Sequence, residues 1–432
     1  MTRCNHIFTR VDWARMIFAA TLILLLPIEC CSQVLPQWGK LKKGSYEVGY
    51  LDTVIFKADE KFSYYSYQGN KPFFIGVWYP SSSDSKVAYM HYKDYFNFQS
   101  KKEYAVILDS LKKAFHDVLI ESGILIDITT QDSIVHVPMG RVQRSLYEDV
   151  LNTRVSAKYH LPKLVKKFPC ILYHHGAQSA LFDNNVFCEY MASHGFVVIS
   201  SSFNLPDQSG VDLLISSTDK RFGYLTDFRF VIDFAKKQPW VDTTSMVAVG
   251  HSLGAQIAMM NDNQEGIKSF QRIIALHTTL EPRTVSEARK FWPKFNYLFD
   301  NQAYLSTTPT FILAPTFLMY RSGLDTLTKR RVIQKITGYP EYKPFRNNDI
   351  TPYTFITVKH GIEHNGFIAV GNSRFPFISK YNLSDSEAIM KQQEIYESIV
   401  KLTADLISTF KKVSNNNEGM GYSKYFLFET IN

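Results

Sequence analysis

The sequence predicts an α/β protein in which helices cover both faces of a mostly parallel sheet. Apolar strand-like runs alternate with amphipathic helical segments from residue 168 onward. These runs are continuously apolar, as expected for strands buried on both faces. A glycine–X–serine–X–glycine segment at 250–254 directly follows one of the runs, which is typical of a sharp turn from strand to helix.

The chain first forms two β-rich segments, expected at 46–57 and 73–79, and then an insertion at about 81–161. Apolar residues at helical spacing predict helices over 102–122 and 142–152 within it. Further strands are expected at 168–173, 196–201, 246–249, 272–276, 310–313 and 353–358. Helices are expected at 184–194, 222–237, from 253 onward, 324–336 and 384–410. The last begins with Ser384-Asp385-Ser386-Glu387, a capping-box pattern.

Residues 1–32 read as a signal peptide. Three arginines precede a short apolar run, and small residues follow it. About 13 apolar residues are too few for a typical membrane span. Cleavage after Ser32 is expected, with lipid attachment at Cys30 or Cys31 as the alternative, so the chain is predicted to be secreted or periplasmic.

Composition favours a globular domain without a disulfide framework. The chain is 45% hydrophobic and 14% aromatic. Residues 33–411 are expected to form one domain with insertions at about 81–161 and 282–308, followed by a tail at 412–432. Loss of the leader leaves Cys170 and Cys188, expected as two buried thiols rather than a pair. The net charge of +8 is spread along the chain, so no nucleic-acid partner is predicted.

Ser252 is the expected nucleophile, because it is the serine of the 250–254 segment. A serine hydroxyl needs a base to take its proton. His364 is the expected base, since it follows the last predicted strand, and His360 is its competitor. The sequence after the 168–173 strand is His174-His175-Gly176-Ala177. The backbone amides of Ala177 and Leu253 are therefore the expected oxyanion donors.

No metal site is predicted, because no further ligand spacing accompanies the His174-His175 pair.

Five co-linear segments resemble the platelet-activating-factor acetylhydrolase-like branch of the α/β-hydrolases, to which dienelactone hydrolases are related. The resemblance spans roughly residues 70–370. The segments are Val77-Trp78-Tyr79-Pro80, residues 174–177, Met191-Ala192-Ser193-His194-Gly195-Phe196-Val197-Val198, residues 250–254 and His364. The resemblance implies an α/β-hydrolase fold and a cofactor-free serine esterase or lipase acting on short acyl or phospholipid-like esters.

The catalytic acid departs from this pattern. The family commonly has an aspartate after the Ala-Leu that ends the strand following the serine, and here Ala275-Leu276 is followed by His277. Glu281 and Asp325 are the alternative acids, with Glu281 slightly favoured. The absence of an acid is a third alternative, and it would leave the imidazole poorly oriented.

Two other functions stay open. One is a catalytically degenerate hydrolase fold kept as a binding protein, because folds do not fix function. The other is an esterase for acetyl or feruloyl groups on polysaccharides. Aromatic residues in the two insertions fit an apolar acyl or ring site, or equally the packing of a lid; they are Tyr92, Tyr95, Phe96, Phe98, Phe291, Trp292, Phe295 and Tyr297. The sequence leaves the natural ester and the oligomeric state open.

Overall fold

A computed structural model describes the residues on which the fold depends. The described residues are 35–84, 86–98, 102–120, 124, 141–177, 179–203, 205–207, 210–211, 218–262, 268–279, 290, 308–315, 353–359, 362, 364–408, 422 and 424–430. The leader at 1–32, Glu281, Asp325, His360, Phe291, Trp292, Phe295, Tyr297 and the helix expected at 324–336 lie outside them.

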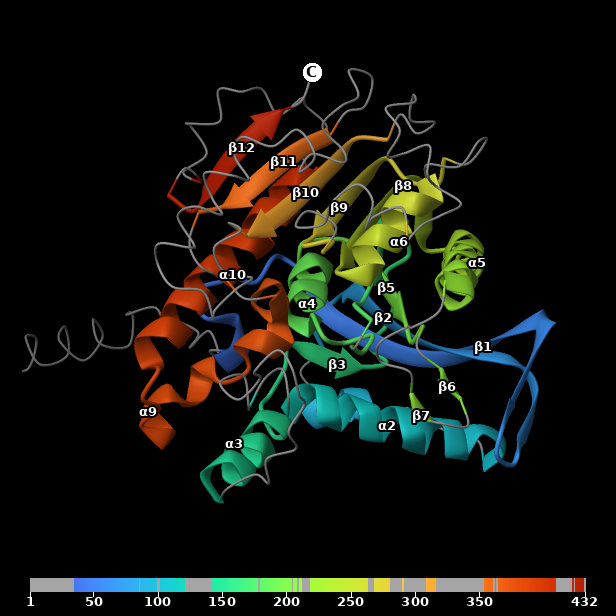
Figure 1. Cartoon of the computed structure of the whole chain (residues 1–432), viewed down its shortest axis with the longest axis horizontal. Coiled ribbons are helices and arrows are strands. Elements are labelled where there is room, and N and C mark those ends of the chain that lie inside the picture. Colours follow the sequence, from blue (N-terminus) through green and yellow to red (C-terminus); the bar gives the residue numbers. More distant parts are fainter. Residues whose placement is uncertain are drawn as a thin grey trace, which may run out of the picture. The chain divides into compact units, whose positions relative to one another are not determined.

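A ten-stranded mixed sheet forms the centre of the domain (Figure 1). Its spatial order is β12-β11-β10-β9-β8-β4-β5-β2-β1-β3. Strands β5, β4, β8, β9, β10 and β11 are mutually parallel neighbours in that order. The strands are β1 (Glu47–Tyr64), β2 (Tyr67–Ser81), β3 (Ala157–Tyr159), β4 (Phe168–His174), β5 (Val197–Ser201), β8 (Val241–His251), β9 (Arg272–Leu276), β10 (Thr310–Pro315), β11 (Tyr353–Val358) and β12 (Phe426–Thr430). A separate two-stranded ribbon consists of β6 (Pro206–Asp207) and β7 (Gly210–Val211).

Helices cover both faces of the sheet, as the sequence predicts. Cys170 and Leu172 of β4 belong to the buried cluster that includes α5 (Thr218–Lys236) and α6 (Leu253–Asp262). Successive side chains of a strand point to opposite faces. Accordingly Tyr173, the next residue of β4, contacts Phe187 of α4 (Asn185–Ser193) on the other face.

The closing helix α10 (Ser386–Ser408) lies on the same face as α4. Arg272 of β9 donates a hydrogen bond to the Leu406 carbonyl of this helix, and the hydroxyl of Tyr396 donates to Asn184 at the start of α4. The predicted α/β fold, with a mostly parallel and doubly covered sheet, is confirmed.

The insertion after β2 carries two helices near their predicted positions, α2 (Ala105–Leu119) and α3 (Arg141–Leu151). Its aromatic side chains are buried: Tyr92, Tyr95, Phe96 and Phe98. Three of them contact the Phe182 ring, and the Tyr95 ring stacks on it at 5.8 Å. These four aromatic residues therefore pack the insertion against the rest of the domain. For them the packing role, rather than an acyl or ring site, is the one that the structure shows.

Short helical turns fill the remaining described connections. They are η1 (Pro36–Trp38), η2 (Tyr92–Phe96), η3 (Lys102–Tyr104), η9 (His364–Phe367), η10 (Ala369–Asn372), η11 (Phe375–Phe377) and α9 (Ile378–Tyr381). Cys170 and Cys188 are free and buried, so the prediction of two thiols is confirmed.

Three local predictions need correction. Residues 426–430, assigned to a tail, form edge strand β12, which pairs antiparallel with β11. The β1–β2 hairpin continues past residue 57 to a turn at Tyr65, because its polar outer part extends beyond the apolar core. Helix α10 begins at Ser386 rather than Ser384, and the Asp385 carboxylate pairs with Arg374 at 2.8 Å.

Candidate active site at the carboxyl edge of the sheet

Ser252 lies at the turn between β8, which ends at His251, and α6, which begins at Leu253. Its φ of +55° is in the left-handed region, which costs an L-residue about 1–2 kcal/mol. Backbone hydrogen bonds hold this conformation. The Ser252 N–H donates to the Leu276 carbonyl of β9 at 3.0 Å, and the Ser252 carbonyl accepts from Gln256 at 3.2 Å.

The two glycines of the 250–254 segment allow the backbones around Ser252 to approach closely. A Cβ added at Gly250 would lie 2.4 Å from the carbonyl carbon of Gly254. A Cβ at Gly254 would lie 2.1 Å from the carbonyl oxygen of His174, at the end of β4. Strand β8, helix α6 and the end of β4 therefore pack backbone to backbone at this turn, which explains the need for glycine.

His364 lies at the same edge of the sheet, at the start of η9 after β11. Its Nδ1 is 2.9 Å from Nδ1 of His277, which directly follows β9. His277 has a φ of +48°, and its N–H donates to the Leu313 carbonyl of β10 at 2.7 Å. The residue that stands where the family has an aspartate is thus the described hydrogen-bond partner of the expected base.

His251 is a third histidine in this cluster, and no sequence pattern pointed to a role for it. Its Nε2 is 3.1 Å from the His364 carbonyl oxygen. Because a carbonyl only accepts, His251 carries its proton on Nε2. The His251 and His364 rings have centroids 4.5 Å apart. His251 therefore binds the backbone carbonyl of His364, and His277 binds its ring.

Burial makes these imidazoles weak bases. It lowers the pKa of His364 to about 4, and it lowers the pKa of both His251 and His277 well below the usual value, with the neighbouring imidazoles adding to the effect. All three rings are neutral at pH 7. A neutral imidazole can accept a proton, as a general base must.

No hydrogen bond joins the hydroxyl of Ser252 to the His364 ring, although both residues are described. Ser252 and His364 are both partly exposed, whereas His277 is only 1% exposed. Catalytic hydrogen bonds are often long in a free enzyme and shorten when substrate binds. The structure thus brings the nucleophile and base candidates to one edge without closing the contact between them.

The loop after β4 lies against Ser252 on its other side. A Cβ added at Gly176 would lie 3.2 Å from Ser252 Cβ and 3.3 Å from His251 Nδ1. Ala177 is the next residue, in a turn and partly exposed. Leu253 is the first residue of α6, where backbone N–H groups have no partner within the helix. Both expected oxyanion donors are therefore in segments that adjoin Ser252.

Neutral histidines brace this loop. The His175 ring is fully buried, with Nδ1 2.7 Å from the Gly176 carbonyl oxygen, and its Nε2 accepts from the Phe203 N–H at 3.2 Å. Burial lowers the pKa of His175 to about 4. The His174 ring stacks on Phe203 with centroids 3.8 Å apart.

Asp183 is the buried carboxyl group nearest this loop in the chain. The Tyr173 hydroxyl donates to its Oδ1 at 2.6 Å. Burial raises the pKa of Asp183 to about 7, although the Gly176 amide facing it favours the charged form. Asp183 contacts Tyr173 and the Gly176 amide, where the loop leaves β4. It is therefore not placed as a partner of His364.

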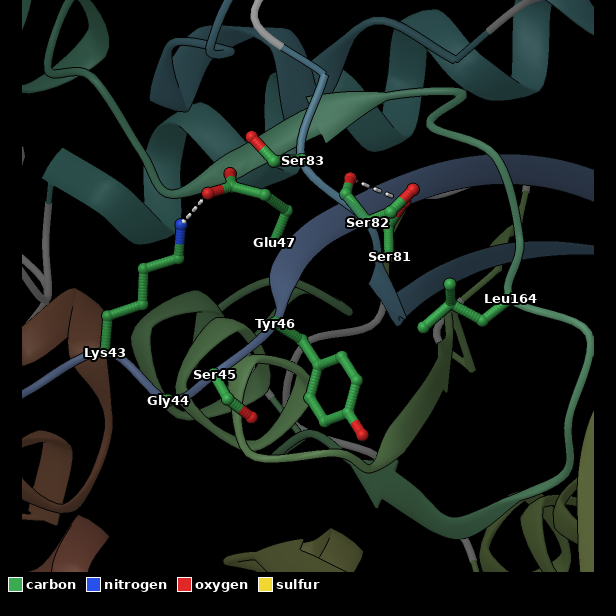
Figure 2. Close-up of a pocket in the computed structure, with 9 residues that line it drawn as sticks. All are labelled: Lys43, Gly44, Ser45, Tyr46, Glu47, Ser81, Ser82, Ser83 and Leu164. Carbon is green, nitrogen blue, oxygen red and sulfur yellow. Dashed lines mark hydrogen bonds and ion pairs between the residues drawn. The ribbon is translucent and has the colours of Figure 1, made fainter.

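A surface hollow of about 400 Å³ lies elsewhere (Figure 2). Glu47 and Ser81, paired in β1 and β2, are among its lining residues. Because Ile75 of antiparallel β2 pairs with Ser201, the last residue of β5, Ser81 lies toward the opposite end of the sheet from Ser252. Lys43 pairs with Glu47 across the hollow at 2.6 Å. This hollow is not the site of Ser252.

The described residues contain no group of three or more His, Cys, Asp or Glu side chains placed to hold a metal ion. None of the helices in the described ranges is long and apolar enough to cross a membrane.

No family model matches the sequence, and no curated protein matches it. Among solved structures, the fold is similar to a ferulic acid esterase from Streptomyces cinnamoneus. The identity is 12% and the TM-score 0.45, over 83% of this chain and 90% of that one.

Proposed function

We propose that this chain is a serine hydrolase that cleaves carboxylic esters through an acyl-enzyme, with Ser252 as nucleophile. The observation that carries the proposal is the left-handed backbone of Ser252 at the tip of β8, at the start of α6 and beside Gly176. Left-handed backbone at a residue other than glycine is costly, and such strain clusters at functional sites. Thr279 (φ +62°) and His277 share it at this edge.

The reaction follows from the groups around Ser252. The His364 Nε2 takes the hydroxyl proton as Oγ attacks the ester carbonyl. The amides of Ala177 and Leu253 stabilise the oxyanion, and the His364 imidazolium then protonates the leaving alcohol. Water then attacks the acyl-enzyme with His364 as the base, which releases the carboxylic acid and frees Ser252.

The substrate class is a short acyl or phospholipid-like ester, in line with the acetylhydrolase-like resemblance. Export through the leader at 1–32 belongs to the same proposal, with a lipid on Cys30 or Cys31 as the alternative to plain cleavage.

Hydrolysis of short p-nitrophenyl esters by the purified mature chain tests the proposal. Ser252→Ala should abolish turnover, and His364→Ala should lower kcat by about 10²–10⁴-fold, the usual contribution of a general base. Ser63→Ala is the matched control, because Ser63 is an exposed serine of β1. Turnover that survives Ser252→Ala would contradict the proposal.

A binding protein on a degenerate hydrolase fold is the second candidate, and the specific observation in its favour is His277 in the aspartate position. Background-level turnover of every ester by the folded parent chain would favour it.

A further inference from the structure

A second imidazole lies behind the expected base where a carboxylate is usual. We infer that His277 is the positioning residue of this site, so that Ser252, His364 and His277 form a serine–histidine–histidine triad. The inference deepens the proposed function and rests on it. The Nδ1–Nδ1 distance of 2.9 Å is a full hydrogen bond between the two rings.

Burial decides which of the two rings is the base. His277 is 1% exposed, and its ring packs against Phe367 with centroids 5.3 Å apart. His364 is partly exposed. Only His364 can therefore reach a substrate or the hydroxyl of Ser252, and His277 acts through it.

The bond between the rings selects the tautomer that catalysis needs. Two neutral imidazoles share one N–H between their Nδ1 atoms, so one ring donates and the other accepts. When His277 accepts, His364 carries its proton on Nδ1 and presents a free lone pair on Nε2. That lone pair takes the Ser252 proton. The His364 Nδ1–H stays in its bond to His277 throughout, and the Nε2 proton passes to the leaving alcohol.

The loop that carries His277 is held firmly. The backbone of His277 is in the left-handed region, where histidine is found more often than most residues other than glycine. Gln256, on the helix that begins at the Ser252 turn, donates to the Thr278 carbonyl at 2.6 Å and to the Thr279 hydroxyl at 3.2 Å. The same helix therefore positions the nucleophile and the loop of His277.

The surroundings of His364 contain no described acidic partner. Among the described residues, the titratable groups that face it are His277 after β9 and His251 at the end of β8. His175, from the loop after β4, helps to lower the pKa of His251. The described partner of the His364 ring is therefore an imidazole.

Three substitutions at His277 test the inference, with kcat for a p-nitrophenyl ester as the readout. The Oδ1 of Asn and Asp is as many bonds from the backbone as Nδ1 of His, and both residues tolerate left-handed backbone. His277→Asn keeps a neutral acceptor and should stay within about tenfold of the parent. His277→Ala removes the acceptor and should lower kcat by about 10²–10⁴-fold.

The pH profile of kcat/KM gives a readout that a merely structural residue would not move. His277→Asp puts a negative charge beside His364 and favours its protonated form. The acid limb of the profile should therefore move to higher pH by about one unit or more, while the limb of His277→Asn should stay near that of the parent.

The inference is overturned if His277→Asn loses as much activity as His277→Ala, or if folded His277→Asp keeps the parent's acid limb. It is also overturned if chelation abolishes turnover and Zn²⁺ restores it, because a metal would then join the rings. Circular dichroism reports folding, and if His277→Ala fails to fold, the Asn and Asp variants decide. Failure of the proposed function is distinct, since the parent chain would then show no Ser252-dependent turnover.

Discussion

Gly254→Ala should destabilise the chain and disrupt the site together. The added methyl would lie 2.1 Å from the His174 carbonyl oxygen, 2.6 Å from its carbonyl carbon and 2.6 Å from the His175 carbonyl oxygen. Real Cβ atoms essentially never approach closer than 3.0 Å. The atoms in the way are backbone, so no side chain can rotate to relieve the contact. Helix α6 and the end of β4 must separate by about 1 Å.

Two magnitudes follow from that separation. Overpacking a well-packed interior costs about 1–3 kcal/mol and occasionally more, and backbone contacts put this change at about 3 kcal/mol. The displaced segment leads directly into Gly176 and Ala177, beside the nucleophile. A misplacement of about 1 Å can lower turnover by about 10²-fold, so kcat should fall by that amount in the fraction that stays folded.

Gly223→Ala is the matched control. Gly223 lies within α5, and a Cβ added there meets nothing within 4 Å. Alanine in a helix interior is favoured over glycine by about 0.5–1 kcal/mol, so this variant should be slightly more stable than the parent and equally active. Urea unfolding and ester turnover measure both variants. A Gly254→Ala chain as stable and active as Gly223→Ala would refute the packing described at the Ser252 turn.

Two pH effects follow from the buried histidines. The kcat/KM for ester hydrolysis should rise with pH through about 4, where the base His364 loses its proton, and stay level from pH 6 to 8; a limb near 6.5 would contradict the lowered pKa of His364. His175 is neutral when folded and has a pKa lowered to about 4, so the unfolded chain binds the extra proton first and stability falls as pH drops below 6.5. Between pH 7 and pH 4.5 this residue should account for about 2.5 kcal/mol. Urea unfolding at both pH values should therefore show a larger loss of unfolding free energy for the parent than for His175→Gln. Equal losses would contradict a His175 ring that is neutral when buried.

Much of the fold could be predicted because long apolar runs are specific. Strands β9 and β11 have the predicted bounds, and the predicted helices that lie among the described residues differ from the predictions by a few residues at their ends. Strand β12 was missed because it is a short edge strand with one side exposed: Phe426 is 1% exposed and Leu427 49%. The residues on the exposed side of such a strand need not be apolar, so its sequence predicts a strand less strongly than the continuous apolar runs of strands buried on both faces.

The site was predictable only in part. The 250–254 segment predicted a strand-to-helix turn at Ser252, and the place of His364 after the last parallel strand predicted its edge of the sheet. The partners of His364 were not predictable, because the pairing of His277 with it depends on two left-handed residues and on strand neighbours far apart in the chain. The departure from the family's aspartate was the only sequence signal that pointed to His277. Glu281 and Asp325 lie outside the described residues.

Mass spectrometry after treatment with a fluorophosphonate tests the central claim most directly. The account predicts one adduct per chain on the Ser252 peptide, no adduct in Ser252→Ala, and slower labelling in His364→Ala. A folded parent chain that takes up no label, or carries it on another residue, would contradict the account.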